Sequence, residues 1–210
     1  MDRTPEIAAA GEAARAILEA RHRAREITLT ACRATIQASA RAIRAVHRGE
    51  YDAARHSIAE ARVALAEADT ALAGHDDIRH AGFLRDATKE YVEANLTLAF
   101  VTHAPMPTAA ELGAEPAAYL NGMAEAASEL RRQVLDRLRE DRLDEAESLM
   151  TVMDDVYTLL VTIDYPDAMT GGLRRTTDAL RAVLERTRGD LTTTIVAARL
   201  QSSIERLDRA

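Results

Sequence analysis

Residues 83–100 of the chain read FLRDATKEYVEANLTLAF, a stretch that changes from charged to uncharged halfway along. Glu90 and Glu93 stand at that change, three positions apart, so on an α-helix their carboxylates project from one face. No charged residue follows between positions 94 and 102, which predicts that the second half of the helix is buried. A carboxylate pair at the start of a buried segment indicates a site for a cation.

The composition of the whole chain is typical of long helices. Alanine, leucine and long charged residues dominate its 210 residues, while only 3% are aromatic and tryptophan is absent. Nothing in the composition marks a second domain, and no repeat of 20 to 50 residues is visible. We therefore expect one all-α domain over residues 1–210, a bundle of about seven helices with a very long first helix.

Proline and glycine set the expected helix boundaries. The helices are expected over residues 4–48, 51–73, 77–103, 117–140 and 143–163, and over 173–207 as one long helix or two helices broken at Gly189. Thr4 is expected to cap the first helix, with Pro5 in its first turn. Residues 104–116 hold three of the five prolines and are expected to form a loop.

The charged residues and the single cysteine indicate the partners and the compartment that suit the protein. The net charge is -7, and Lys89 is the only lysine among 27 basic residues. Arginine suits bidentate contact with phosphate or carboxylate, but a bias in codon usage is the better explanation of the ratio. Cys32 is alone, which excludes an intramolecular disulfide and favours a reducing compartment. Without a signal peptide or a long apolar stretch, we expect a soluble cytoplasmic protein that does not enter a membrane.

A second carboxylate pair, Glu125 and Glu129, lies four positions apart in the expected helix over 117–140. If this helix packs beside the one that carries Glu90 and Glu93, four carboxylates converge, and hard oxygen ligands of this kind select Mg²⁺ or Mn²⁺. Such an ion promotes phosphodiester hydrolysis. Gly122 on the same face favours a close approach. Acidic residues at these spacings are also ordinary on solvated helix faces, so the spacing alone leaves both interpretations open.

Other kinds of site find less support. A ferritin-like di-iron bundle needs two Glu-x-x-His motifs, and only Glu19 with His22 fits, in a polar part of the first helix. The sequence contains neither a P-loop nor a glycine-rich dinucleotide turn. No Ser-His-Asp arrangement can be picked out from the six histidines.

Basic residues cluster at the end of the first expected helix and at the start of the third. These candidates for contact with nucleic acid are Arg41, Arg44, His47 and Arg48, followed by Arg79, His80 and Arg85. Their spacing allows them to line a groove and neutralise phosphates, whereas the acidic total argues against non-specific coating of duplex DNA. For any single arginine, an ion pair with a nearby carboxylate is the simpler explanation.

Three segments resemble the translin and Trax family. Residues 83–94, FLRDATKEYVEA, resemble the Trax segment with its Glu-Tyr-Val-Glu-Ala core. Residues 119–130, YLNGMAEAASEL, resemble the Tyr-Leu-x-Gly-x-Ala motif that is followed by Gly-Glu-Leu, and residues 43–48, IRAVHR, match the end of the family's first helix. The resemblance covers roughly residues 15–165, and the two acidic motifs together are specific.

The resemblance implies a seven-helix fold that assembles into hollow, usually eight-membered shells around RNA or single-stranded DNA. Trax is the Mg²⁺-dependent endoribonuclease subunit of such shells, and translin is the RNA-binding subunit. By position, Glu90, Glu93, Glu125 and Glu129 fall on the catalytic, metal-binding carboxylates of Trax. Trax has Asp at the position of Glu125 and Gly at that of Ser128, whereas translin-like binders have a neutral residue in place of Glu125.

The resemblance therefore predicts an RNA-binding endoribonuclease that uses Mg²⁺ or Mn²⁺. It is expected to cleave single-stranded or small structured RNA inside a homo-oligomeric shell, with an octamer favoured and single-stranded DNA as a possible further ligand. Two alternatives remain open, a shell that binds nucleic acid without cleaving it and a helical assembly protein that binds none. The four carboxylates should converge on one solvent-accessible spot.

Overall fold

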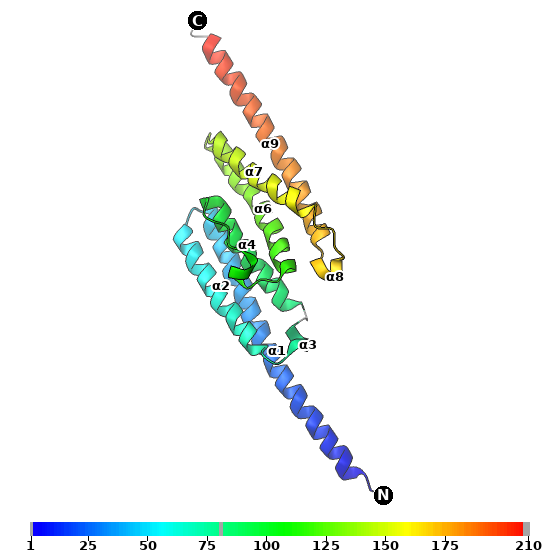
Figure 1. Ribbon diagram of the computed structural model, residues 1–210. Helices are drawn as coiled ribbons and strands as arrows, with labels where there is room; N and C mark the ends of the chain where they lie inside the picture. Colours follow the sequence, from blue (N-terminus) through cyan, green and yellow to red (C-terminus); the bar gives the residue numbers. More distant parts are fainter. Residues whose placement is uncertain (1, 80–81, 208–210) are drawn as a thin grey trace.

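The computed structural model describes residues 2–79 and 82–207, and every regular element in these ranges is a helix (Figure 1). The six long helices are α1 (Thr4–His47), α2 (Tyr51–Ala71), α4 (Phe83–Thr102), α6 (Pro116–Arg139), α7 (Leu143–Leu160) and α9 (Leu173–Leu207). The three short ones are α3 (Asp76–Arg79), α5 (Ala109–Leu112) and α8 (Asp167–Thr170). The all-α class and the long first helix are confirmed, and the expected seven helices are replaced by six long and three short ones.

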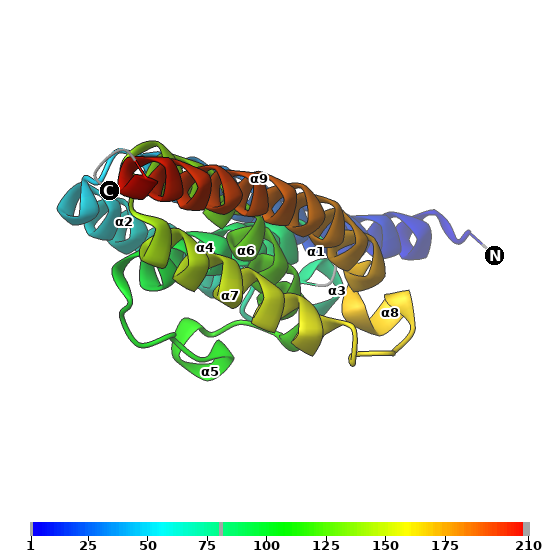
Figure 2. The same ribbon diagram turned by 90° about the horizontal axis from the view of Figure 1, so that it is seen from above.

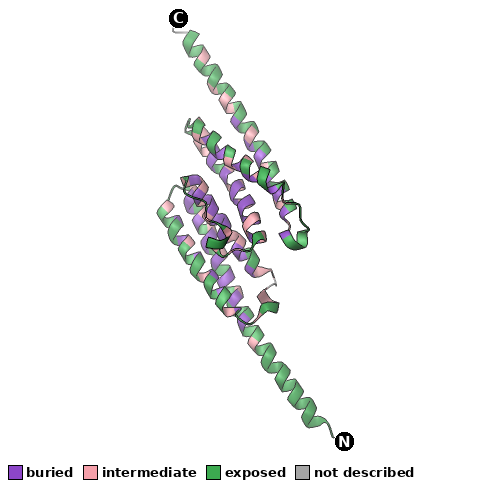
Figure 3. Ribbon diagram, in the orientation of Figure 1, coloured by how far each residue is buried: buried purple, intermediate pink, exposed green. Residues whose placement is uncertain are grey.

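The helices α4 and α6 form the centre of the bundle. Helix α1 packs against α2 and α4, while α6 packs against α4, α7 and α9. The contact between α4 and α6 therefore joins the two sides of the molecule, as Figure 1 shows. Buried residues concentrate on these two helices, whereas the first half of α1 and the end of α9 project from opposite ends and are exposed (Figure 3).

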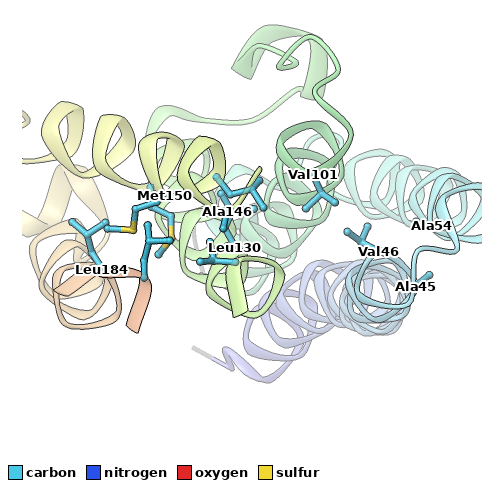
Figure 4. Close-up of a cluster of buried hydrophobic side chains, with 12 residues drawn as sticks. Ala45, Val46, Ala54, Val101, Leu130, Ala146, Met150 and Leu184 are labelled. Carbon is cyan, nitrogen blue, oxygen red and sulfur yellow. The ribbon is translucent and has the colours of Figure 1, made fainter. Parts of the chain in front are cut away.

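One cluster of buried apolar side chains draws on all six long helices (Figure 4). Its members include Val46 of α1, Ala54 of α2, Val101 of α4, Leu130 of α6, Met150 of α7 and Leu184 of α9. Burial of such side chains stabilises each by about 1.5–3 kcal/mol relative to exposure. Both sides of the bundle thus share a core, and this core fixes α4 against α6.

The structure differs from the sequence expectation within one expected helix and at the start of another. The helix expected over residues 77–103 is divided, because Gly82 adopts a φ of +96° that cannot continue a right-handed helix. Of the two alternatives for residues 173–207, the structure has the single long helix, because α9 runs without a break through Gly189. At the start of α1 the cap residue is Arg3, so Thr4 is the first helical residue and not the cap.

The proline-rich stretch between α4 and α6 contains the short helix α5, at the margin of the bundle (Figure 2). The Thr108 side chain accepts a hydrogen bond from the backbone N–H of Glu111, whose carboxylate accepts one from the backbone N–H of Thr108. This reciprocal pair satisfies two backbone donors that the start of a helix leaves free. The expected loop is therefore partly ordered by a capped turn.

Two further expectations concern the environment of the chain. Among the residues that the structure describes, no helix combines the length and apolar character needed to cross a membrane. Cys32 lies in the core of α1, where burial raises the pKa of its thiol to about 11. A buried thiol of this kind is unreactive.

Candidate metal centre

The close contact of α4 with α6 depends on Gly122. A Cβ atom at this position would lie 2.7 Å from the backbone oxygen of Lys89 and 2.8 Å from Cγ1 of Val92, closer than real side chains allow. The absence of a side chain therefore lets α6 approach the backbone of α4. Glu125 follows Gly122 by three positions and lies on the same side of α6. It is thereby placed against α4 beside Glu90.

Three of the four carboxylates predicted from the sequence converge at this contact. Oxygen atoms of Glu90, Glu93 and Glu125 all lie within 4.8 Å of one another. Glu93 is 7% exposed, whereas Glu90 and Glu125 are partly open to solvent. The cluster thus presents three hard oxygen donors on one side of the α4–α6 contact, and this donor set fits Mg²⁺ or Mn²⁺.

The electrostatics of the cluster oppose ionisation of Glu93. Burial raises the pKa of its carboxyl, and the nearby carboxylates of Glu90, Glu125 and Glu129 raise it further, to about 8, against the lowering effect of Lys89. Both causes act on the charged form, since burial removes its hydration and like charges repel it. A divalent cation in the cluster would remove this repulsion and favour the ionised form.

Lys89 places a positive charge inside the cluster. Its Nζ lies 2.5 Å from Oε2 of Glu125 and 3.3 Å from Oε1 of Glu90. Burial lowers the pKa of the Lys89 ammonium, but the two carboxylates more than offset this effect and the pKa is raised. The ammonium of Lys89 therefore neutralises part of the negative charge of these carboxylates. Sequence reasoning gave Lys89 no role in the site.

Glu129 lies beside the three converging carboxylates but is directed to another partner. Its Oε2 lies 2.6 Å from Nε2 of His47, which comes from the last turn of α1. The Nδ1 atom of the same imidazole lies 3.3 Å from Nε2 of Gln133, one turn further along α6. His47 was expected to contact nucleic acid, but its side chain is only 6% exposed and faces Glu129.

The structure places the other basic candidates that it describes at the surface. Four form ion pairs, Arg41 with Glu60 at 2.6 Å, Arg48 with Glu50 at 2.6 Å, Arg79 with Asp69 at 2.8 Å and Arg85 with Asp86 at 3.9 Å. Arg44 is exposed one turn before His47 and has no ion pair within residues 2–79 and 82–207. Arg85 is exposed in the first turn of α4, and His80 lies outside the described residues. The first cluster therefore adjoins the acidic site through His47.

A comparison with protein-family models finds no match for the chain. Among curated proteins, the uncharacterized protein MJ0175 of Methanocaldococcus jannaschii is 33% identical over 127 residues. The matched region is 60% of this chain and 57% of that protein. The chain thus spans little more than half the length of this curated relative.

Solved structures match over nearly the whole chain. A structure of AfC3PO in complex with duplex RNA has a TM-score of 0.79 and 31% sequence identity, covering 89% of this chain and 96% of that one. A crystal structure of AfC3PO has a TM-score of 0.78 and 30% identity, covering 89% and 97%. Apo-NeC3PO has a TM-score of 0.73 over 92% of this chain and 100% of its own, but at 18% identity this likeness concerns the fold alone.

Proposed function

Because this chain belongs to the translin/C3PO family, we propose that it is an RNA-binding, metal-dependent endoribonuclease. The observation that carries the proposal is the convergence of Glu90, Glu93 and Glu125 within 4.8 Å of one another. These carboxylates would hold Mg²⁺ or Mn²⁺, and Glu129 completes the acidic set from its place beside them. A bound ion supplies stabilisation of charge on the leaving oxygen and activation of a water.

The residues around the carboxylates prepare the site before the metal binds. The ammonium of Lys89 forms ion pairs with Glu125 and Glu90, and its positive charge offsets the repulsion between these two carboxylates. Glu93 is fixed by burial on α4, so its carboxylate needs little reorganisation to serve as a ligand. Glu90 and Glu125 are partly exposed and leave the site accessible to a polymer.

RNA is the polymer that we propose for this site. Arg44 and Arg48 flank His47, and the contact of His47 with Glu129 places this positive surface next to the carboxylates. A phosphate backbone bound by the arginines would therefore lie close to the metal. The similar protein AfC3PO has been solved in complex with duplex RNA, which supports this choice of ligand. We further propose that several copies form a shell with the sites inside.

The test is cleavage of end-labelled single-stranded and duplex RNA with Mg²⁺ or Mn²⁺ and with EDTA. EDTA should abolish cleavage, and Glu125→Gln should reduce it by more than the ~10–100-fold that loss of an outer partner of a metal typically costs. Glu147→Gln, the same change at an exposed position on α7, is the control and should keep full activity. Equal cleavage by Glu125→Gln, or cleavage that persists in EDTA, would rule out the mechanism.

A shell that binds RNA without cleaving it is the second candidate. The ammonium of Lys89 already neutralises part of the cluster, and Glu125 is one methylene longer than the Asp of Trax, which shifts its oxygens. This candidate predicts RNA binding without cleavage in either metal. Binding should then survive Glu125→Gln but weaken in the double variant Arg44→Ala, Arg48→Ala.

A further inference from the structure

The imidazole of His47 connects the acidic cluster to a series of hydrogen-bonded side chains on α6, Gln133 and Arg137. Its Nε2 lies 2.6 Å from Oε2 of Glu129, and its Nδ1 lies 3.3 Å from Nε2 of Gln133. Gln133 is 3% exposed, and its Oε1 accepts a hydrogen bond from Nη1 of Arg137 at 3.3 Å. The function proposed above uses the contact of His47 with Glu129 only to locate the arginines, and it gives Gln133 and Arg137 no role.

The direction of each hydrogen bond in this series of side chains follows from Arg137. A guanidinium only donates, so the amide oxygen of Gln133 must face Arg137 and the amide N–H groups must face His47. The Nδ1 atom of His47 is then an acceptor, which leaves the proton of the neutral imidazole on Nε2. Nε2 therefore donates to Glu129, whose carboxylate accepts.

We infer that His47 is a positioning residue for Glu129. It anchors this carboxylate of α6 to the end of α1 and holds it at the edge of the metal cluster, one turn from Glu125. Gln133 and Arg137 act through His47 by keeping the proton on Nε2. This inference rests on the proposed metal site. Loss of a partner that orients a metal ligand typically lowers metal affinity about tenfold or more.

Calorimetric titration of the full chain with Mn²⁺ tests the inference without RNA. His47→Ala should weaken Mn²⁺ binding about tenfold. His47→Gln should restore most of the affinity, because its amide N–H can reach the same oxygen of Glu129. Gln133→Leu keeps the shape but removes the donor to Nδ1, so its affinity should lie between those of the wild type and His47→Ala. His56→Ala is the control, since His56 is an exposed histidine on α2 that faces Glu60 at 3.4 Å.

The outcomes separate the inference from the proposed function. Wild-type affinity in a folded His47→Ala protein would overturn the role of His47 and leave the metal site intact. Equal weakening in His47→Gln and His47→Ala would show that side-chain shape and not the hydrogen bond matters, which also overturns it. If the wild-type protein binds no Mn²⁺, the proposal of a metal site is wrong, and so is the positioning role of His47 that depends on it. Thermal unfolding without metal establishes that each variant is folded.

Discussion

Glu93 is the residue whose ionisation the metal-free fold opposes. Its pKa of about 8 lies well above the ordinary value of 4.5 for a glutamate, so between these pH values the folded protein holds a proton that the unfolded chain releases. The stability that comes from this proton is fully present below pH 4.5 and is lost as the pH rises toward 8. Each unit of pKa shift corresponds to about 1.4 kcal/mol.

The variant Glu93→Gln keeps the shape of this side chain and removes its ionisation. In EDTA it should be more stable than the wild type at pH 9 by about 1–3 kcal/mol, and the difference should shrink toward zero at pH 5. Urea unfolding at both pH values measures the free energy of unfolding. Glu147→Gln is the control, and its free energy of unfolding relative to wild type should not change with pH. If the stabilities of the wild type and of Glu93→Gln change with pH in parallel, Glu93 does not have a raised pKa in the folded protein.

Sequence spacing predicted which carboxylates come together better than it predicted the partners of these carboxylates. Glu90 and Glu93 share a helix, so their common side follows from their separation alone. Lys89 was missed because its ammonium meets Glu125 only where two helices cross, which no spacing on one helix reveals. The contact of His47 with Glu129 was missed for the same reason, because Glu129 is 82 positions away along the chain. His47 was therefore predicted to contact nucleic acid instead.

At the scale of helices, two glycines in helix interiors have opposite surroundings. Gly122 is enclosed by the backbone of Lys89 and the side chain of Val92, whereas Gly189 of α9 has no atom within 4 Å of an added Cβ. A methyl group therefore clashes with its surroundings at position 122 and fits without contact at position 189. Only the first glycine positions a carboxylate.

The matched changes Gly122→Ala and Gly189→Ala test this difference. Overpacking should make Gly122→Ala less stable by about 1–3 kcal/mol, even though alanine favours a helix by about 1 kcal/mol. It should also weaken Mn²⁺ binding, because α6 moves Glu125 away from α4. Gly189→Ala should be more stable than wild type by roughly 0.5–1 kcal/mol with unchanged Mn²⁺ binding. Urea unfolding and calorimetry measure both, and equal stability of the two variants would refute the close crossing.

Glycine also shows why helix boundaries were predicted less well than helices. The apolar periodicity was sufficient to predict the long helices. Gly82 nevertheless divides an expected helix and Gly189 does not, although both are glycines within helical patterns. Leu184 and Leu191 are buried on either side of Gly189 and hold α9 against the core, a tertiary contribution that exceeds the local preference.

At the scale of the whole molecule, apolar side chains extend beyond the bundle on both projecting helix ends. Ile7 and Ile17 on α1, and Leu200 and Ile204 on α9, are each at least half exposed. Figure 3 shows that neither end is covered by another part of the protomer. Apolar surface left open on a projecting helix favours association, and a second copy of the chain is the partner that the proposed shell supplies.

Light scattering should therefore find the wild-type protein as an oligomer. The double change Leu200→Glu, Ile204→Glu should lower the mass, because it places charge in an apolar contact, while circular dichroism shows unchanged helix content. Gln201→Glu adds charge at an exposed polar position of the same helix and should leave the mass unchanged. A monomeric wild type, or an unaltered mass in the double variant, would contradict assembly through α9.

The fold class and the great length of the first helix were predictable from composition and from the spacing of proline and glycine. The projection of half of α1 beyond the bundle was not, because it depends on where its partners α2 and α4 end. The first buried residue of α1 is Ala24, so the preceding turns have no core to join in a single protomer.

The two projecting ends lie at opposite ends of the bundle (Figure 1), so if the proposed shell assembles through both of them, each copy is a monomer with two binding ends. Such units either close into a ring or grow as an open chain, and the rotation between successive contacts decides which. If each end binds its own kind across a two-fold axis, inactivating the α9 end leaves pairs joined through α1. If the α1 end binds the α9 end, the same change leaves single protomers. The residual mass of one variant thus reveals the symmetry of the whole assembly.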